Sequence, residues 1–219
     1  MPLHIKADHD SVAKMVIASG NIDIVKQLSE LFQGRLVNDN RGFFLYTGSY
    51  DGVPVSAIYH GIGGASESIA FEELAQLGVK KIITLENAIL SYKKGFNAMI
   101  SSSASYSEGG TIGEYVTSQK VVLSAVPSFK LLMGLDIAFT KHKVKHIIGP
   151  TLTVDVLNYK KPGKLKFICA EMHCAVLYAL SQIRGFESAC VIIPNSGKNL
   201  TKKIITDIES SVSDALIAD

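Results

Sequence analysis

A glycine-rich turn is the stretch of this sequence whose residue types point most directly to chemistry. Residues 60–64 read His60-Gly61-Ile62-Gly63-Gly64, between an apolar run and a segment with helical spacing. Where a strand leads into a helix, backbone N–H groups and the helix dipole can hold an anion or a sugar. Glycines also occur at such turns only because the chain needs a positive φ. The turn therefore predicts a ligand site whose nature other residues must decide.

The three cysteines offer no competing site. Cys169, Cys174 and Cys190 follow neither a metal-binding nor a disulfide spacing. An odd number of thiols in apolar segments is typical of a protein from a reducing compartment. We interpret all three as core residues, and we expect no metal and no cofactor.

Composition narrows the class of protein. The 219 residues are 47% hydrophobic, which is enough to bury a large core without disulfides or metals. The net charge is only +2, with acidic and basic residues mixed along the chain. This argues against a nucleic-acid partner, which favours a basic stripe, and against a polybasic membrane anchor. The first residues lack a signal-peptide pattern, and no apolar stretch is long enough to span a bilayer. We expect a cytoplasmic protein.

Strands and helices are predicted on both sides of the glycine turn. Residues 12–19 favour a strand, and residues 22–32 have helical spacing of apolar side chains. Two apolar runs, 43–49 and 53–60, flank Tyr50-Asp51-Gly52, which is typical of a hairpin. A helix over 66–77 then follows the turn and ends before Gly78.

The second half of the chain repeats this alternation. Strands are predicted at 79–85, 97–103, 144–148 (closed by Gly149-Pro150), 165–169 and 189–193, and helices at 127–139, 172–183 and 198–217. Strands separated by helices, with one antiparallel hairpin, indicate an α/β fold in which helices flank a mixed central β-sheet. No linker or repeat divides residues 1–219, so we expect a single domain.

Several short motifs occur together in a recognisable order. They are LHIKA at 3–7, IASGN at 17–21, NRGF at 40–43, YTGSYDG at 46–52, HGIG at 60–63 with the segment 66–74, LGVKKII at 77–83 and AEMH at 170–173. This ordered set spans nearly the whole chain. It resembles the nucleoside phosphorylases of the hexameric purine nucleoside phosphorylase and uridine phosphorylase type.

The resemblance implies an α/β/α fold and a pentosyltransferase, a kind of glycosyltransferase. In that family a nucleoside and phosphate give a free base and ribose 1-phosphate, by substitution at the anomeric carbon. Such a site must fix phosphate, hold the ribose and take up charge on the departing base. The family assembles as trimers of dimers, so the resemblance also implies a homo-oligomer of six chains.

The resemblance places four residues at the phosphate: Gly20, Arg41, Thr84 and Asn87. Arg41 corresponds to an arginine that a neighbouring subunit supplies. Ile24 and Thr84 stand where the family has its other two arginines, and Glu86 lies in what should be a small glycine-bearing turn. Lost charge-assisted donors and an added carboxylate both weaken the binding of a dianion. We expect poor phosphate binding here.

The resemblance places seven residues at the nucleoside: His4, Ile62, Leu157, Glu171, Met172, His173 and Asn195. His173 replaces the second glutamate of a Glu-Met-Glu run, and His4 would be lent to an adjacent subunit. Asn195 lies where purine-specific members have an acid. Leu157 lies near their aromatic stacking residue, and no Gln–Arg pair occurs at 158–163.

Three functions remain open on this evidence. The chain is a phosphorylase with an altered site, a non-catalytic descendant that binds a nucleoside or a partner, or a hydrolase in which water replaces phosphate. The third lacks the late aspartate on which such relatives depend. Simpler roles also remain open for three residues: Arg41 at a surface or interface, Glu171 as a carboxylate stabilised at a helix N-terminus, and His173 as a capping or core histidine.

Overall fold

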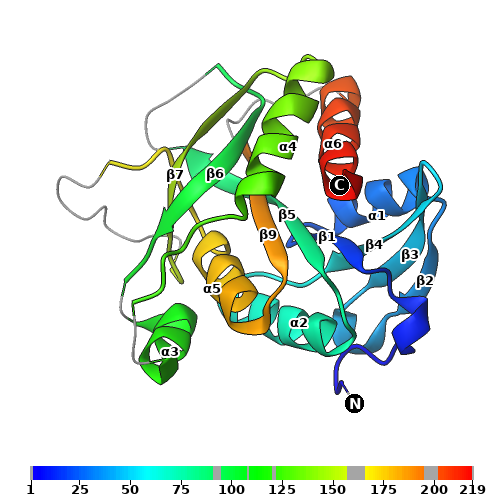
Figure 1. The fold of residues 1–219 in the computed structure, drawn as a ribbon, viewed down its shortest axis with the longest axis horizontal. Helices are drawn as coiled ribbons and strands as arrows, with labels where there is room; N and C mark the ends of the chain where they lie inside the picture. Colours follow the sequence, from blue (N-terminus) through cyan, green and yellow to red (C-terminus); the bar gives the residue numbers. More distant parts are fainter. Residues whose placement is uncertain are drawn as a thin grey trace.

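One mixed β-sheet contains the nine strands of the part of the chain that the structure describes (Figure 1). The computed structural model describes residues 2–90, 95–107, 109–119, 122–156, 166–194 and 202–218. The strand order is β2-β3-β4-β1-β5-β8-β7-β6-β9, and β5 also pairs with β9. The predicted α/β class with a mixed central sheet is confirmed.

The first half of the sheet is open and contains the predicted hairpin. β1 lies between β4 and β5 and is parallel to both, whereas β3 is antiparallel to β4 and to β2. Asp51 and Gly52 at the hairpin turn both have positive φ, 48° and 80°, as a two-residue hairpin loop prefers. The strands are β1 (Met15–Ser19), β2 (Arg35–Asn38), β3 (Leu45–Tyr50), β4 (Val53–Tyr59) and β5 (Lys81–Leu90).

The second half closes on itself. β5 pairs in parallel with β9 from Lys81 and Glu187 to Ala88 and Pro194, and its last residues pair antiparallel with β8. β8 pairs with β7, β7 with β6 and β6 with β9. These five strands therefore form a closed ring, with β5 shared between the ring and the open half. The remaining strands are β6 (Ala98–Ser105), β7 (His146–Thr153), β8 (Cys169–Glu171) and β9 (Glu187–Pro194).

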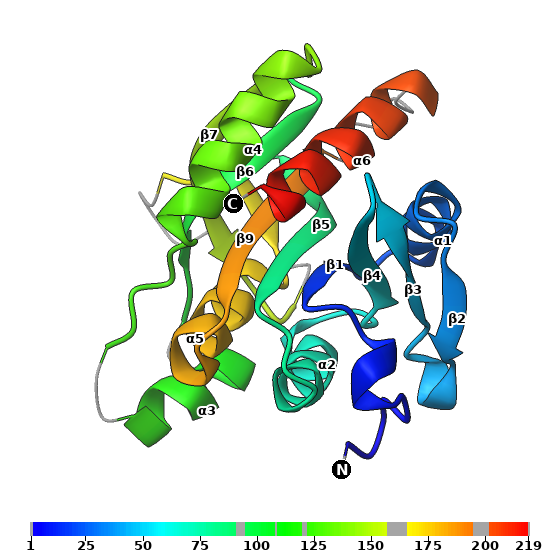
Figure 2. The same cartoon turned by 45° about the vertical axis from the view of Figure 1, so that its right-hand side comes forward.

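Helices cover both faces of the sheet (Figure 2). Alternate strand residues point to opposite faces, so Ile82 joins the core under α2 and α5 while Ile83 joins the core under α1, α4 and α6. α3 lies beside α5. The α-helices are α1 (Ile22–Leu31), α2 (Gly64–Gln76), α3 (Gly110–Gln119), α4 (Phe129–Lys141), α5 (Cys174–Arg184) and α6 (Lys202–Ile217), and two 3-10 helices span His9–Ser11 and Asn40–Gly42. Within the described residues no helix is long and apolar enough to cross a membrane.

The prediction that Gly149-Pro150 ends a strand is wrong, because β7 continues through both residues to Thr153. The register of β6 shifts between Ser101 and Ser103, which pair with Gly149 and Pro150. A proline lacks the N–H that a regular ladder needs, and here it lies where the ladder is already irregular. Strand β2 and helix α3 were not predicted. The strand expected at 165–169 is wrong in its bounds, because β8 spans Cys169–Glu171 and residues 166–168 are not in a strand, while residue 165 lies outside the described residues.

The three cysteines are buried and free, as predicted. Cys169 lies 3.8 Å from the sulfur of Met99, and burial raises the pKa of all three thiols. A raised pKa keeps a thiol protonated and unreactive. They belong to the core.

A buried glutamate on α6 makes the stability of the fold depend on pH. Glu209 is 4% exposed and its Oε1 has no hydrogen-bond partner among the described residues. Burial, together with nearby Glu30, raises its pKa to about 7, against about 4.3 in an unfolded chain. Between these values the folded chain holds a proton that the unfolded chain releases, so rising pH favours unfolding.

We therefore predict that the wild type loses stability relative to Glu209→Gln as the pH rises from about 5 to about 8. Urea unfolding of both proteins across this range measures the difference. Parallel pH profiles would show that Glu209 does not carry the effect.

Candidate active site

Six of the residues predicted to bind ligand line a single pocket at the carboxyl ends of β1 and β5. The pocket has a volume of ≈ 250 Å³. The parallel strands β1 and β4 end side by side, and β5 continues past them to Leu90; the carboxyl ends of parallel strands are where open α/β sheets bind ligands. Its lining residues are Gly20, Asn21, Ile62, Glu86, Asn87, Ala88, Ala170, Glu171, Met172 and His173.

Glu86 occupies the centre of this arrangement. It is 2% exposed, and the Gly20 N–H donates to its two carboxylate oxygens at 3.0 and 3.2 Å. The Nε2 of His60 lies 2.8 Å from Glu86 Oε1, and the Nε2 of His173 lies 3.6 Å from Oε2. Burial raises the pKa of Glu86 to about 7, against the opposing effects of His173 and the Gly20 N–H. The amide predicted to bind phosphate thus already binds a carboxylate of the same chain.

A second glutamate, Glu67, lies in the first turn of α2, and His173 contacts both it and Glu86. It is fully buried, and neither of its carboxylate oxygens has a hydrogen-bond partner in the described chain. The Nδ1 of His173 lies 3.4 Å from its Oε2. Burial, followed by the charges of Glu86 and Glu171, raises the pKa of Glu67 well above its usual value.

His60 connects these groups at the end of β4. Its ring is fully buried, and it lies edge-on to the rings of Phe71 and His173, with centroids 5.5 and 5.1 Å away. Burial, and then the neighbouring His173, hold the pKa of His60 well below its usual value. The glycine turn follows at once. Gly61 and Gly63 both have positive φ there, and Ser66 Oγ donates to the His60 carbonyl.

Glu171 has hydrogen-bond partners within the protein. Its Oε2 accepts the backbone N–H groups of His173 and Cys174, at the start of α5, and its Oε1 accepts the hydroxyl of Thr153. A carboxylate at a helix N-terminus satisfies amides that have no helical partner. This geometry favours the simpler of the two roles expected for Glu171. His173 makes no side-chain capping bond at this helix.

Three predicted site residues lie away from the pocket. Thr84 is buried in the middle of β5, between Ala18 and Cys190 on the neighbouring strands. Arg41 is exposed in the 3-10 helix Asn40–Gly42. His4 is held by Glu73, whose carboxylate accepts the backbone N–H groups of residues 3–5 and lies 2.8 Å from His4 Nδ1. Leu157 and Asn195 lie outside the described residues.

Sequence reasoning did not single out Glu67 as a functional residue. An acidic residue in the first turn of a helix is common, because the helix dipole stabilises it. In the structure, buried residues such as Glu67, Ser68 and Ala70 lie on more than one face of helix α2. The burial of Glu67 could therefore be inferred only once the position of α2 was known.

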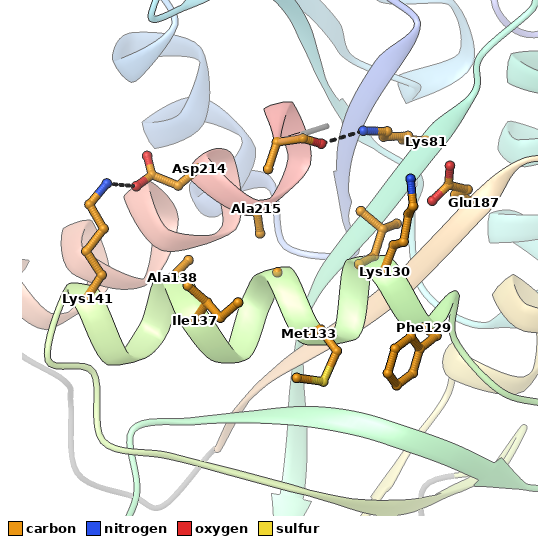
Figure 3. A pocket seen from close by; sticks show the side chains of 13 residues that line it. Lys81, Phe129, Lys130, Met133, Ile137, Ala138, Lys141, Glu187, Asp214 and Ala215 are labelled. Atoms are coloured by element: carbon orange, nitrogen blue, oxygen red, sulfur yellow. Dashed lines mark hydrogen bonds and ion pairs between the residues drawn. The ribbon is translucent and has the colours of Figure 1, made fainter.

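A larger hollow lies between α4 and α6, with a volume of ≈ 680 Å³ (Figure 3). It contains none of the predicted site residues. Three of its charged groups already have partners: Lys141 Nζ lies 2.8 Å from Asp214, and Lys81 Nζ donates to the carbonyl of Ala218 at 2.7 Å. Phe129, Met133 and Ile137 give it an apolar wall along α4. The smaller pocket remains the candidate active site.

An α/β/α fold with a polar pocket at the carboxyl ends of its parallel strands defines the general class of this protein as a ligand-binding α/β protein. Comparison with known families makes the assignment specific. The model of the Phosphorylase superfamily matches residues 14–203. The chain belongs to the phosphorylase superfamily, and the resemblance to nucleoside phosphorylases is confirmed.

Individual relatives agree with this assignment. The chain is 29% identical to a uridine phosphorylase of Thermococcus kodakarensis, over 87% of this chain and 76% of that protein. It is 24% identical to a guanosine phosphorylase of Halorubrum lacusprofundi, over 86% and 80%. A crystal structure of uridine phosphorylase from Vibrio fischeri, complexed with 6-hydroxy-1-naphthoic acid, has the same fold. Its TM-score is 0.84 at 22% identity, covering 98% of this chain and 94% of that one.

The contacts of Glu171 predict a structural cost for its replacement. Glu171→Gln keeps the shape but loses the charge and an acceptor oxygen facing the N–H groups of His173 and Cys174. We expect a loss of about 1.5–3 kcal/mol in the free energy of unfolding without ligand, measured by urea denaturation. Unchanged stability combined with weaker nucleoside binding would instead assign the carboxylate to the ligand.

Proposed function

We propose that this chain binds a nucleoside in the pocket between Gly20, Ile62 and Met172, and that it catalyses phosphorolysis only weakly. The named relatives are uridine, guanosine and purine nucleoside phosphorylases, which supports a nucleoside as the ligand. The observation on which the proposal rests is the hydrogen bond from the Gly20 N–H to Glu86.

The polar and apolar groups of the pocket suit a sugar with an attached base. Ile62 is 70% exposed and, with Met172 and Ala88, offers an apolar surface. Asn21 and Asn87 supply side-chain amides to the pocket, and the Asn21 Nδ2–H donates to the side-chain Oδ1 of Asn87 at 3.1 Å. Pockets of this kind use apolar walls for affinity and a few polar groups for orientation.

The carboxylate of Glu86 has two opposite effects on the proposed reaction. It competes with phosphate for the Gly20 N–H and repels an incoming dianion. It also favours positive charge, such as the charge that develops on ribose during substitution at the anomeric carbon. No lysine or arginine is buried among the described residues, so His60 and His173 are the basic groups described close to Glu86 that could offset the repulsion. We therefore expect the pocket to bind a nucleoside and to bind phosphate, the second substrate, only weakly.

A chromatographic assay of base release over a panel of nucleosides tests this function. The reaction is run with phosphate, with arsenate and with neither. Slow release that requires either anion supports weak phosphorolysis. Release without an anion would contradict the proposal and indicate hydrolysis. Absence of release, together with a thermal shift by nucleosides, would favour the second candidate, a non-catalytic nucleoside-binding protein. That candidate gains support from Glu86 and Glu171, whose carboxylates both bind their own chain.

Removing the charge of Glu86 should improve phosphate binding. Glu86→Gln keeps the side-chain size and an acceptor for the Gly20 N–H while eliminating the repulsion. We predict that the Kd for phosphate falls by about tenfold or more, measured by calorimetry with a chelator present. Glu30→Gln removes an exposed charge on α1 and serves as the control. An equal gain in both variants would mean that net charge, not Glu86, limits binding.

We also propose that the protein is a cytoplasmic homo-oligomer, with six chains arranged as a trimer of dimers. Arg41 is exposed and His4 is far from its own pocket, in contact with Glu73, as expected for residues supplied to a neighbour. Phe129 and Ile137 on α4 are 75% and 65% exposed, which favours a partner on the surface. Light scattering should give the mass of a hexamer. A monomeric mass would remove Arg41 and His4 from the site.

A further inference from the structure

The inner end of the pocket gathers two imidazoles and two carboxylates that are almost inaccessible to solvent. His60 and Glu67 are fully buried, Glu86 is 2% exposed and His173 is 6% exposed. They come from β4, α2, β5 and the segment before α5, so three-dimensional folding alone brings them together. Buried carboxylates normally face a cation or a set of hydrogen-bond donors.

Glu67 has no hydrogen-bond donor in the described chain, and His173, whose Nδ1 lies 3.4 Å from Oε2, is the one basic group of the described chain within ion-pair distance of it. In its ionised form both oxygens lack a donor, and no lysine or arginine of the described chain is buried. In its protonated form the O–H lacks an acceptor, because neither oxygen has a hydrogen-bond partner. The Nδ1 atoms of His60 and His173 also lack partners. A buried polar group left without a hydrogen bond is destabilising. His173 alone leaves Glu67 Oε1 without a partner in either protonation state of the carboxyl group.

A metal ion satisfies these atoms together. One ligand atom from each of His60, Glu67 and His173 lies within 4.8 Å of the other two. Ligands about 2.1 Å from a tetrahedral Zn²⁺ lie about 3.4 Å apart. The His173 Nδ1 and Glu67 Oε2 atoms are already at 3.4 Å. The other two separations, each within 4.8 Å, must shorten by at most about 1.4 Å to reach this spacing.

We propose that His60, Glu67 and His173 form a binding site for a divalent transition-metal ion, with Zn²⁺ as the probe that fits best. Two imidazole nitrogens and one carboxylate oxygen are a typical zinc ligand set that leaves a fourth position open. Glu86 lies at the opposite nitrogen of each ring, 2.8 Å from His60 Nε2 and 3.6 Å from His173 Nε2, where a carboxylate can orient imidazoles that bind a metal through Nδ1. The site goes beyond nucleoside binding and does not depend on it.

The ion changes the electrostatics of the pocket. It compensates the charge of Glu67 and Glu86, which otherwise disfavour an anion next to Gly20. Bound cations are often the largest local charge in a site. The metal-loaded pocket is therefore expected to accept an anion that the metal-free pocket rejects.

Metal binding is tested on the whole chain without nucleoside or phosphate. Protein stripped with a chelator is titrated with Zn²⁺ by calorimetry, and with Co²⁺ to record the visible absorption of a tetrahedral site. We expect each chain to bind one ion at the buried site, and we expect the melting temperature of the protein to rise when the ion binds. Glu67→Gln and His173→Gln should each weaken this binding by about 100-fold or more. Glu209→Gln, which alters another buried glutamate, should leave it unchanged.

Two results would overturn the proposal. The first is an absence of Zn²⁺ binding to the wild type. The second is equal binding by wild type and Glu67→Gln, which would place the ion elsewhere, for example at the exposed His9. His173→Gln decides the question if Glu67→Gln does not fold. Because no nucleoside is present, either result leaves the proposed nucleoside chemistry unaffected.

Discussion

The hydrogen bond between the Gly20 N–H and the Glu86 carboxylate is the interaction on which the pocket depends. It joins the end of β1 to β5, and the same carboxylate contacts His60 at the end of β4. A free N–H at a strand end offers an anion site, and here a side chain of the same protein fills it. The fold of the phosphorylase superfamily is thus retained while the electrostatics of its pocket differ from those of an open anion site.

Burial strengthens the electrostatic effect of the carboxylates that surround this hydrogen bond. Glu67, Glu86 and Glu171 are each at most 2% exposed, but only Glu171 has a full set of donors, from Thr153 and the start of α5. In a region of low dielectric, unmatched carboxylates interact strongly with one another and with any charged ligand. The two histidines and the Gly20 N–H lie close enough to moderate that charge. The proposed phosphate and the proposed metal ion would therefore both meet the charge of the same small set of side chains.

Much of the fold could be predicted from local patterns, whereas the site could be predicted only in part. The hairpin at Asp51-Gly52 and helix α1 follow from turn chemistry and apolar spacing. Gly20, Asn87 and Glu171, which short motifs single out in the sequence, line one pocket, but their roles there stay predictions. The closure of β5 with β9 could not be predicted, since pairing of distant strands leaves no local pattern. The contacts of Glu67 depend on that closure and on α5 packing against α2, and no spacing along the chain reports them.

A crystal structure grown from high phosphate with a bound nucleoside tests the central claim most directly. Glu86 should remain on the Gly20 N–H, at about the 3.0 Å separation seen here, with the nucleoside between Ile62 and Met172 and no anion at Gly20. A phosphate bound to the Gly20 N–H, with the Glu86 side chain turned away while the site holds no metal, would contradict it.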